Sequence, residues 1–160
     1  MSPKPTGRLS GNDLVLTRTF RAPIDDVWTS VTSSESTARW FGPWERVPGD
    51  DKKIRIQMAF EETKPWLDGT IDQCEAPRLL SLRTKGMYAE KRLSLELTEA
   101  AGTTTLEFVH HEINRKMIGE LGPGWEYYLD LLVAAREGTA TPSFETYYPA
   151  QKDHYTALDV

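Results

Sequence analysis

Residues 122–138, reading GPGWEYYLDLLVAAREG, constrain the fold more than any other part of the chain. Apolar residues recur there at helical spacing, at Trp125, Tyr128, Leu129, Leu132 and Ala135, with a second set at Tyr127, Leu131 and Ala134. The Gly-Pro-Gly run is expected to precede the helix, and Gly138 suits the left-handed position after it. A long amphipathic helix late in a chain otherwise patterned as strands predicts a helix packed over a sheet.

Length and charge exclude several classes of protein. The 160 residues fit one domain with a core of ordinary size. A net charge of -5 and the lack of any basic run longer than a doublet argue against nucleic acid or an anionic membrane as a partner. With no signal-peptide pattern and no run of 18 apolar residues, we expect a cytoplasmic protein. The single cysteine, Cys74, excludes an internal disulfide.

The composition divides the chain into three regions. Residues 1–12 are rich in Pro, Ser, Gly and Lys, which predicts a flexible arm. Residues 13–138 carry the periodic patterns of a single domain. Residues 139–160 form a tail with four aromatic side chains, and a disordered tail would normally hold fewer, so we expect the tail to be partly packed.

Inside the domain, strand patterns outnumber helix patterns. Apolar alternation predicts strands at residues 14–21, 53–61, 66–75, 78–84, 88–97 and 103–112. Two short helices are predicted after the first strand, over residues 24–32 and around residues 34–40. Strands that follow one another without intervening helices pair as an antiparallel meander. The predicted fold is therefore α+β, with a curved antiparallel sheet of about six strands wrapped around the long C-terminal helix.

Four motifs in this order resemble a known superfamily. They are LTRTFRAPIDDVW at 16–28, ARWFGP at 38–43, TTTLEFVHHE at 103–112 and GPGWEYYLDLL at 122–132. The pattern resembles the START-like helix-grip superfamily, also called SRPBCC or polyketide cyclase/dehydrase. Within it, the motifs look like the branch named after the C-terminal domain of the activator of the heat-shock-protein-90 ATPase. The resemblance implies a cavity between helix and sheet, used in relatives for hydrophobic ligands, for partner contacts or, in a minority, for catalysis.

The histidines of the HHE run are the most catalytic-looking residues. Strand alternation would place His110 and Glu112 on one face and His111 on the other, so the three cannot converge on one metal. A carboxylate beside an imidazole raises its basicity, and the His110/Glu112 pair could then polarise a water. The alternative is that both histidines are ordinary sheet residues. We assign no catalytic residue, no metal site and no cofactor from the sequence.

The aromatic side chains are better candidates for a ligand site. Ligand pockets are mostly apolar with a few polar anchors. The candidate binding residues are Arg18, Trp40, Trp44, Met58, Trp66, His110, Trp125, Tyr128 and Leu132. Arg18 shares a strand face with apolar neighbours and needs a partner, for which Glu112 and Glu126 are the candidates. The alternative is that the tryptophans fill a solid core.

Three functions remain open at this point. The leading hypothesis is non-enzymatic binding of a small hydrophobic or amphipathic ligand between helix and sheet. One alternative is an enzyme of cyclase or hydrolase type that uses His110, Glu112 or Asp72 as acid or base. The other is a chaperone-associated interaction module that contacts a protein partner through an exposed aromatic loop at residues 40–44. The sequence determines neither the ligand nor the oligomeric state.

Overall fold

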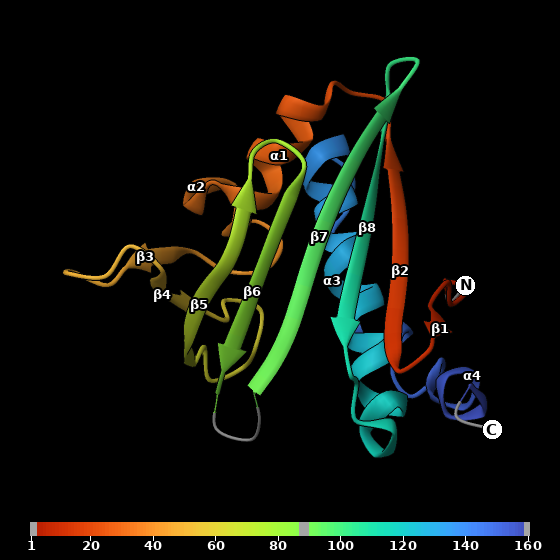
Figure 1. Cartoon of the computed structure of the whole chain (residues 1–160). Helices are drawn as coiled ribbons and strands as arrows, with labels where there is room; N and C mark the ends of the chain where they lie inside the picture. Colours follow the sequence, from red (N-terminus) through yellow and green to blue (C-terminus); the bar gives the residue numbers. More distant parts are fainter. Residues whose placement is uncertain (1–2, 87–89, 159–160) are drawn as a thin grey trace.

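A computed structural model describes residues 3–86 and 90–158, and these form an α+β fold (Figure 1). Its strands are β1 (Arg8–Ser10), β2 (Asp13–Phe20), β3 (Trp44–Arg46), β4 (Lys53–Gln57), β5 (Trp66–Glu75), β6 (Leu79–Lys85), β7 (Glu90–Ala100) and β8 (Thr103–His111). Its helices are α1 (Ile24–Thr32), α2 (Ser34–Thr37), α3 (Ile118–Glu137) and α4 (Lys152–Ala157), with 3₁₀ turns η1 (Arg115–Met117) and η2 (Phe144–Thr146).

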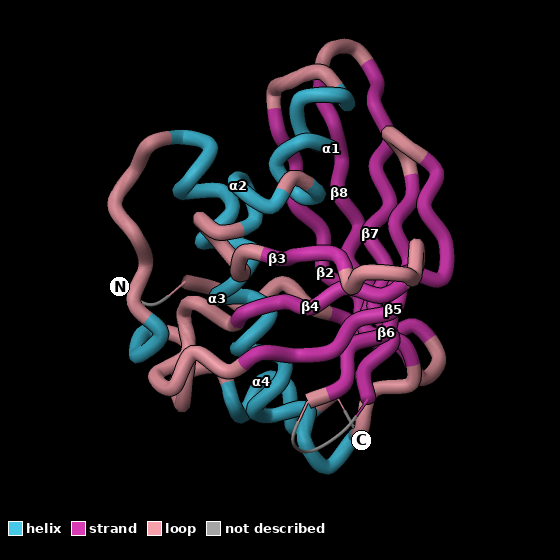
Figure 2. The backbone as a smooth tube through the Cα atoms, turned by 90° about the vertical axis from the view of Figure 1, so that its left-hand side faces the viewer, coloured by secondary structure: helices cyan, strands magenta, loops and turns pink. Residues whose placement is uncertain are grey.

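The described strands form one antiparallel sheet in the order β1-β2-β8-β7-β6-β5-β4-β3. Strands β3 to β8 follow one another as a meander, and β2 closes it by pairing with β8. Helix α3 packs along the sheet, and the core between them contains Leu14, Leu106, Leu129 and Leu132. In both views α1 and α2 lie at one end of the molecule and α4 at the other (Figures 1 and 2). The fold class predicted from the sequence is confirmed.

The described sheet has two more strands than the six that were predicted, namely β1 and β3. β1 and β3 have three residues each, too few for alternation to be visible in the sequence. β1 falls in the stretch expected to be a flexible arm, yet Leu9 pairs with Leu14 of β2. β3 pairs with β4 through Trp44 and Ile56.

Helix α3 begins at Ile118, so the Gly-Pro-Gly run lies inside the helix and the prediction that it precedes the helix is wrong. The glycines are explained by close packing against α4. A Cβ on Gly122 would lie 2.4 Å from the Tyr155 ring, and one on Gly119 would lie 2.8 Å from Thr156 Oγ1. At the other end, Gly138 takes the left-handed conformation with φ of 67°, as predicted.

The tail after Gly138 contributes buried side chains. Tyr147 and Tyr155 are fully buried, and α4 packs against the first half of α3. Phe144 packs edge-on against Tyr127 of α3, with ring centres 5.4 Å apart. The tail therefore covers part of the surface of α3 that the sheet leaves open.

Candidate functional site

A cavity of about 320 Å³ lies between the sheet and the pair of short helices α1 and α2. Its walls come from nearly every strand of the sheet, from both short helices and from one residue of α3. The lining residues are Trp28, Val31, Thr32, Ser33, Thr37, Trp40, Phe41, Gly42, Trp44, Arg46, Ile54, Ile56, Ile71, Cys74, Leu80, Leu82, Leu93, Leu95, Phe108 and Trp125. We call this the first cavity.

Strand alternation explains why the sheet side of the first cavity is apolar. Leu80 and Leu82 of β6, like Leu93 and Leu95 of β7, are two residues apart and therefore share one face. The residues between them point to the opposite face. The sheet thus presents aliphatic side chains to the cavity.

The hydroxyl groups around the first cavity already have partners within the protein. The Thr32 hydroxyl donates to the Trp28 carbonyl at 2.7 Å, and the Thr37 hydroxyl donates to the Ser34 carbonyl at 3.2 Å. Ser33 Oγ accepts a hydrogen bond from the Ser36 amide as the N-cap of α2. The cavity therefore offers an occupant mainly apolar contact.

The aromatic loop at residues 40–44 faces the first cavity. Trp40 is buried, and its indole N–H donates to the Ser30 carbonyl at 3.0 Å. Trp44 is half-buried, and its N–H donates to the Thr32 carbonyl at 2.7 Å. The expectation of an exposed aromatic loop is wrong for Trp40, because both indoles are tied to α1. The Arg46 guanidinium lies 5.5 Å from the centre of the Trp44 ring.

A second cavity, of about 530 Å³, lies between the first half of α3, the β4–β5 connection and the start of β7. Its lining residues are Met58, Phe60, Glu61, Glu62, Thr63, Lys91, Glu120, Leu121, Gly124, Trp125, Tyr127, Tyr128 and Phe144. The Tyr128 hydroxyl donates to Glu61 at 3.3 Å. Burial and the charge of Glu61 raise the pKa of Tyr128, so the phenol stays protonated.

Trp125 lines both cavities, within a cluster of aromatic rings. Its ring centre lies 6.3 Å from that of Phe41 and 5.9 Å from that of Tyr128. Its indole N–H donates to His110 Nδ1 at 3.0 Å. This hydrogen bond uses the neutral imidazole as an acceptor and fixes the Trp125 ring against the sheet.

His110 and Glu112 do not form the pair that alternation predicted. β8 ends at His111, and Glu112 has a φ of 48°, which breaks the strand pattern. The Glu112 carboxylate is exposed and pairs with Arg92 at 3.4 Å, whereas His110 is buried. Burial lowers the pKa of His110 to about 4, and the charge of Lys91 adds to this shift. Asp72, the third acid–base candidate, forms an exposed pair with Arg83 at 2.9 Å.

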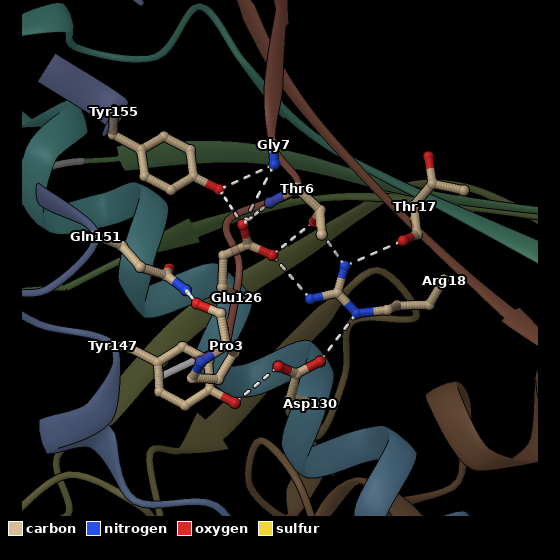
Figure 3. A network of polar contacts seen from close by, with 10 residues as sticks. All are labelled: Pro3, Thr6, Gly7, Thr17, Arg18, Glu126, Asp130, Tyr147, Gln151 and Tyr155. Carbon is tan, nitrogen blue, oxygen red and sulfur yellow. Dashed lines mark hydrogen bonds and ion pairs between the residues drawn. The ribbon is translucent and has the colours of Figure 1, made fainter. Parts of the chain in front are cut away.

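Arg18 joins a buried polar network on the opposite side of α3 (Figure 3). Its guanidinium contacts Glu126 at 2.8 Å and Asp130 at 3.0 Å, so Glu126, and not Glu112, is its partner. Glu126 also accepts hydrogen bonds from Thr6 and from the Tyr155 hydroxyl. Burial alone would raise the pKa of Glu126, but these donors lower it overall. The network holds the N-terminal segment and the tail against α3.

The predicted binding residues therefore fall into separate places. Trp40, Trp44 and Trp125 line the first cavity, whereas Met58, Tyr128 and again Trp125 line the second. His110 accepts the hydrogen bond from the Trp125 indole. The remaining three lie in neither lining: Arg18 in its network, Leu132 in the core, and Trp66 exposed beside Arg55 with the guanidinium 5.0 Å from the ring centre.

Sequence reasoning missed Lys91 and the strand leucines of the first cavity. The alternation of Leu93 and Leu95 predicted a shared face, but nothing in it separates a residue that lines a cavity from one in a solid core. Lys91 reads as a surface residue because basic side chains are seldom buried. Within residues 3–86 and 90–158 no group of three or more His, Cys, Asp or Glu could hold a metal ion, and no helix is long and apolar enough to cross a membrane.

Solved structures of similar fold cover most of the chain. CalU16 from Micromonospora echinospora is 23% identical with a TM-score of 0.75, over 97% of this chain and 95% of that one. The BPP1335 protein from Bordetella parapertussis is 23% identical with a TM-score of 0.72, over 100% and 95% of the two chains. DynU16, a protein of the dynemicin biosynthetic locus, is 22% identical with a TM-score of 0.68, over 84% of this chain and 51% of that one.

A protein-family model identifies the family of the chain, although no curated protein matches it. The model of the family described as activator of Hsp90 ATPase homolog 1-like protein matches residues 21–137, which include α1, every strand from β3 to β8, and α3. The match also spans the residues that line the first cavity. The chain therefore belongs to the family of activator of Hsp90 ATPase homolog 1-like proteins.

Proposed function

We propose that the protein binds a compact hydrophobic or amphipathic molecule in the first cavity without transforming it chemically. The observation that carries this proposal is an apolar cavity whose surrounding hydroxyls are already hydrogen-bonded inside the protein. Its volume of about 320 Å³ is at the lower end of the range for small-molecule sites. The occupant we propose is therefore a molecule of one or two rings or a short alkyl chain.

The polar end of an amphipathic occupant would lie beside Arg46. This residue lines the first cavity and is exposed to solvent, so its guanidinium can meet a ligand without losing its own hydration. The separation of His110 from Glu112, and the exposed Asp72–Arg83 pair, favour binding over acid–base catalysis. The presence of CalU16 and DynU16 among the similar folds is compatible with a small-molecule ligand.

The test is a thermal-shift screen with naphthalene, 1-naphthol and decanoate as probes, followed by calorimetry on any that bind. A ligand taken up only by the folded state stabilises it by about 2.7 kcal/mol at a hundredfold excess over its dissociation constant. We expect at least one probe to raise the melting temperature saturably.

A cavity-filling substitution makes the test specific to the first cavity. Leu82→Phe places a ring in the empty volume and should abolish probe binding while the apo melting temperature stays equal or rises. Ser81→Phe is the matched control, because it puts the same ring on the opposite face of β6 and should leave binding intact. Unchanged binding by Leu82→Phe, or no shift with any probe, would remove the basis of the proposal.

A further inference from the structure

A lysine side chain lines the second cavity beside an aromatic ring. Lys91 is the second residue of β7, and its Nζ lies 5.6 Å from the centre of the Trp125 ring. Among the described parts of the chain, no carboxylate forms an ion pair with this nitrogen. Lys53, the first residue of β4, is an exposed lysine and serves as the comparison.

The surroundings of Lys91 act on the charge of its ammonium group in opposite directions. Phe60, Tyr127 and Phe144 reduce the hydration of the amine, which disfavours the charge, whereas the Trp125 face and the carboxylates of Glu61, Glu62 and Glu120 favour it. Burial lowers the pKa of Lys91, and the charge of Glu61 opposes this shift only in part. A lysine whose pKa is lowered by burial is a better nucleophile at neutral pH, because more of it is present as the free amine.

We propose that Lys91 is a nucleophilic amine that forms a reversible imine with a small aromatic aldehyde or ketone held in the second cavity. The aromatic walls fit the aryl group of such a molecule by stacking or edge contacts, and the volume of about 530 Å³ accommodates it. The proposal goes beyond ligand binding in the first cavity, because the reacting group and the cavity are both different.

The chemistry of the step balances without any oxidant or reductant. The nitrogen lone pair of Lys91 attacks the carbonyl carbon, and proton transfer from nitrogen to oxygen gives a carbinolamine. The hydroxyl then takes up a proton and leaves as water while the nitrogen lone pair forms the C=N bond, and the resulting iminium loses its N–H proton to give the neutral imine. Glu61 lines the same cavity and its charge acts on Lys91, so its carboxylate is a candidate to take up and return these protons.

Reductive trapping of the imine tests the proposal on the full chain. The protein is incubated with benzaldehyde and sodium cyanoborohydride, and peptide mass spectrometry measures the rate of benzyl addition at each lysine. Addition at Lys91 should be at least about tenfold faster than at Lys53, because more of the Lys91 amine is unprotonated. Lys91→Arg keeps the positive charge and should abolish the rapid addition, whereas Lys53→Arg should leave it unchanged.

Benzoate separates covalent chemistry from simple anion binding, because it has the same ring and no electrophilic carbonyl. Slower addition at Lys91 in the presence of benzoate supports a ring bound in the second cavity. Addition spread evenly over the exposed lysines, or equal total addition to Lys91→Arg, overturns the proposal, as does benzoate binding without any trapping at Lys91. The readout is a bond at Lys91, so its failure is distinct from failure of ligand binding in the first cavity.

Discussion

His110 illustrates how one buried side chain links the cavities to the pH dependence of stability. Its pKa is about 4 in the folded protein against 6.5 in a model peptide, because burial disfavours the charged ring. The unfolded chain therefore binds more protons between these values. The stability that His110 contributes is complete above pH 6.5 and is lost progressively as the pH falls towards 4.

We therefore expect His110→Gln to flatten the pH dependence of stability between pH 6.5 and 4. The glutamine oxygen can still accept from Trp125, but it does not titrate. The free energy of unfolding of the wild-type protein should fall by up to about 3 kcal/mol across this window, and that of the variant should fall less. Urea denaturation at a series of pH values measures both. His154→Gln, at an exposed position, is the control and should follow the wild type.

Arg18 and Glu126 allow a second prediction about single residues. Arg18→Met would leave the Glu126 carboxylate buried without its cation, at a cost of about 3–5 kcal/mol of folding stability. Arg83→Met breaks an exposed pair with Asp72, which solvent screens, and should therefore cost far less stability than Arg18→Met. Chemical denaturation of the two variants gives the comparison. Equal costs would mean that the network in Figure 3 contributes no more than a surface ion pair.

The helical elements show how glycine can be a packing residue within a helix. Gly122→Ala would drive a methyl group into the Tyr155 ring, so we expect a loss of about 1–3 kcal/mol despite the better helix propensity of alanine. Gly124→Ala meets nothing within 4 Å and should stabilise the protein by up to about 1 kcal/mol. Thermal melts of the pair measure both effects. The contact with α4 would be unimportant if both variants gained stability.

Local patterns predicted most elements because their periodicity survives in the structure. Ile54 and Ile56 alternate in β4 as expected, and both are buried. The failures occurred where a distant segment decides the local structure. A Gly-Pro-Gly run normally indicates a break before a helix. Here Gly122 lies inside the helix because Tyr155 of α4 packs against it, and the local sequence does not show this contact. Glu112 read as a strand residue because its left-handed backbone has no signature in a glutamate.

For the whole molecule, the sequence predicted the fold class but could not predict where the cavities lie. Whether Trp40 and Trp125 fill a core or line a hollow depends on the separation of α1, α2 and the sheet, and no local pattern encodes that separation. Arg18 was correctly expected to need a partner, and Glu126 was one of two candidates. The position of Lys91 beside the Trp125 ring becomes apparent only when β7 and α3 are placed together.

The tail supports a prediction at this same scale. A chain ended after Gly138 would lack Tyr147 and Tyr155, which are fully buried and donate to Asp130 and Glu126. We expect a loss of at least about 3 kcal/mol of stability. Binding of apolar probes to the first cavity should persist at low temperature, because none of the described tail residues, 139–158, lines that cavity. Denaturation and thermal shift measure the two properties, and an unchanged melt would contradict the role assigned to the tail.

The indole of Trp125 is a wall of two cavities at once, which has a thermodynamic consequence. A ligand in one cavity that tilts the Trp125 ring changes the volume of the other cavity as well. Any effect of a first-cavity ligand on affinity in the second must then be matched by an equal effect in the reverse direction. The hydrogen bond to His110 limits the tilt of the ring, so the strength of this coupling depends on how firmly the imidazole holds the indole.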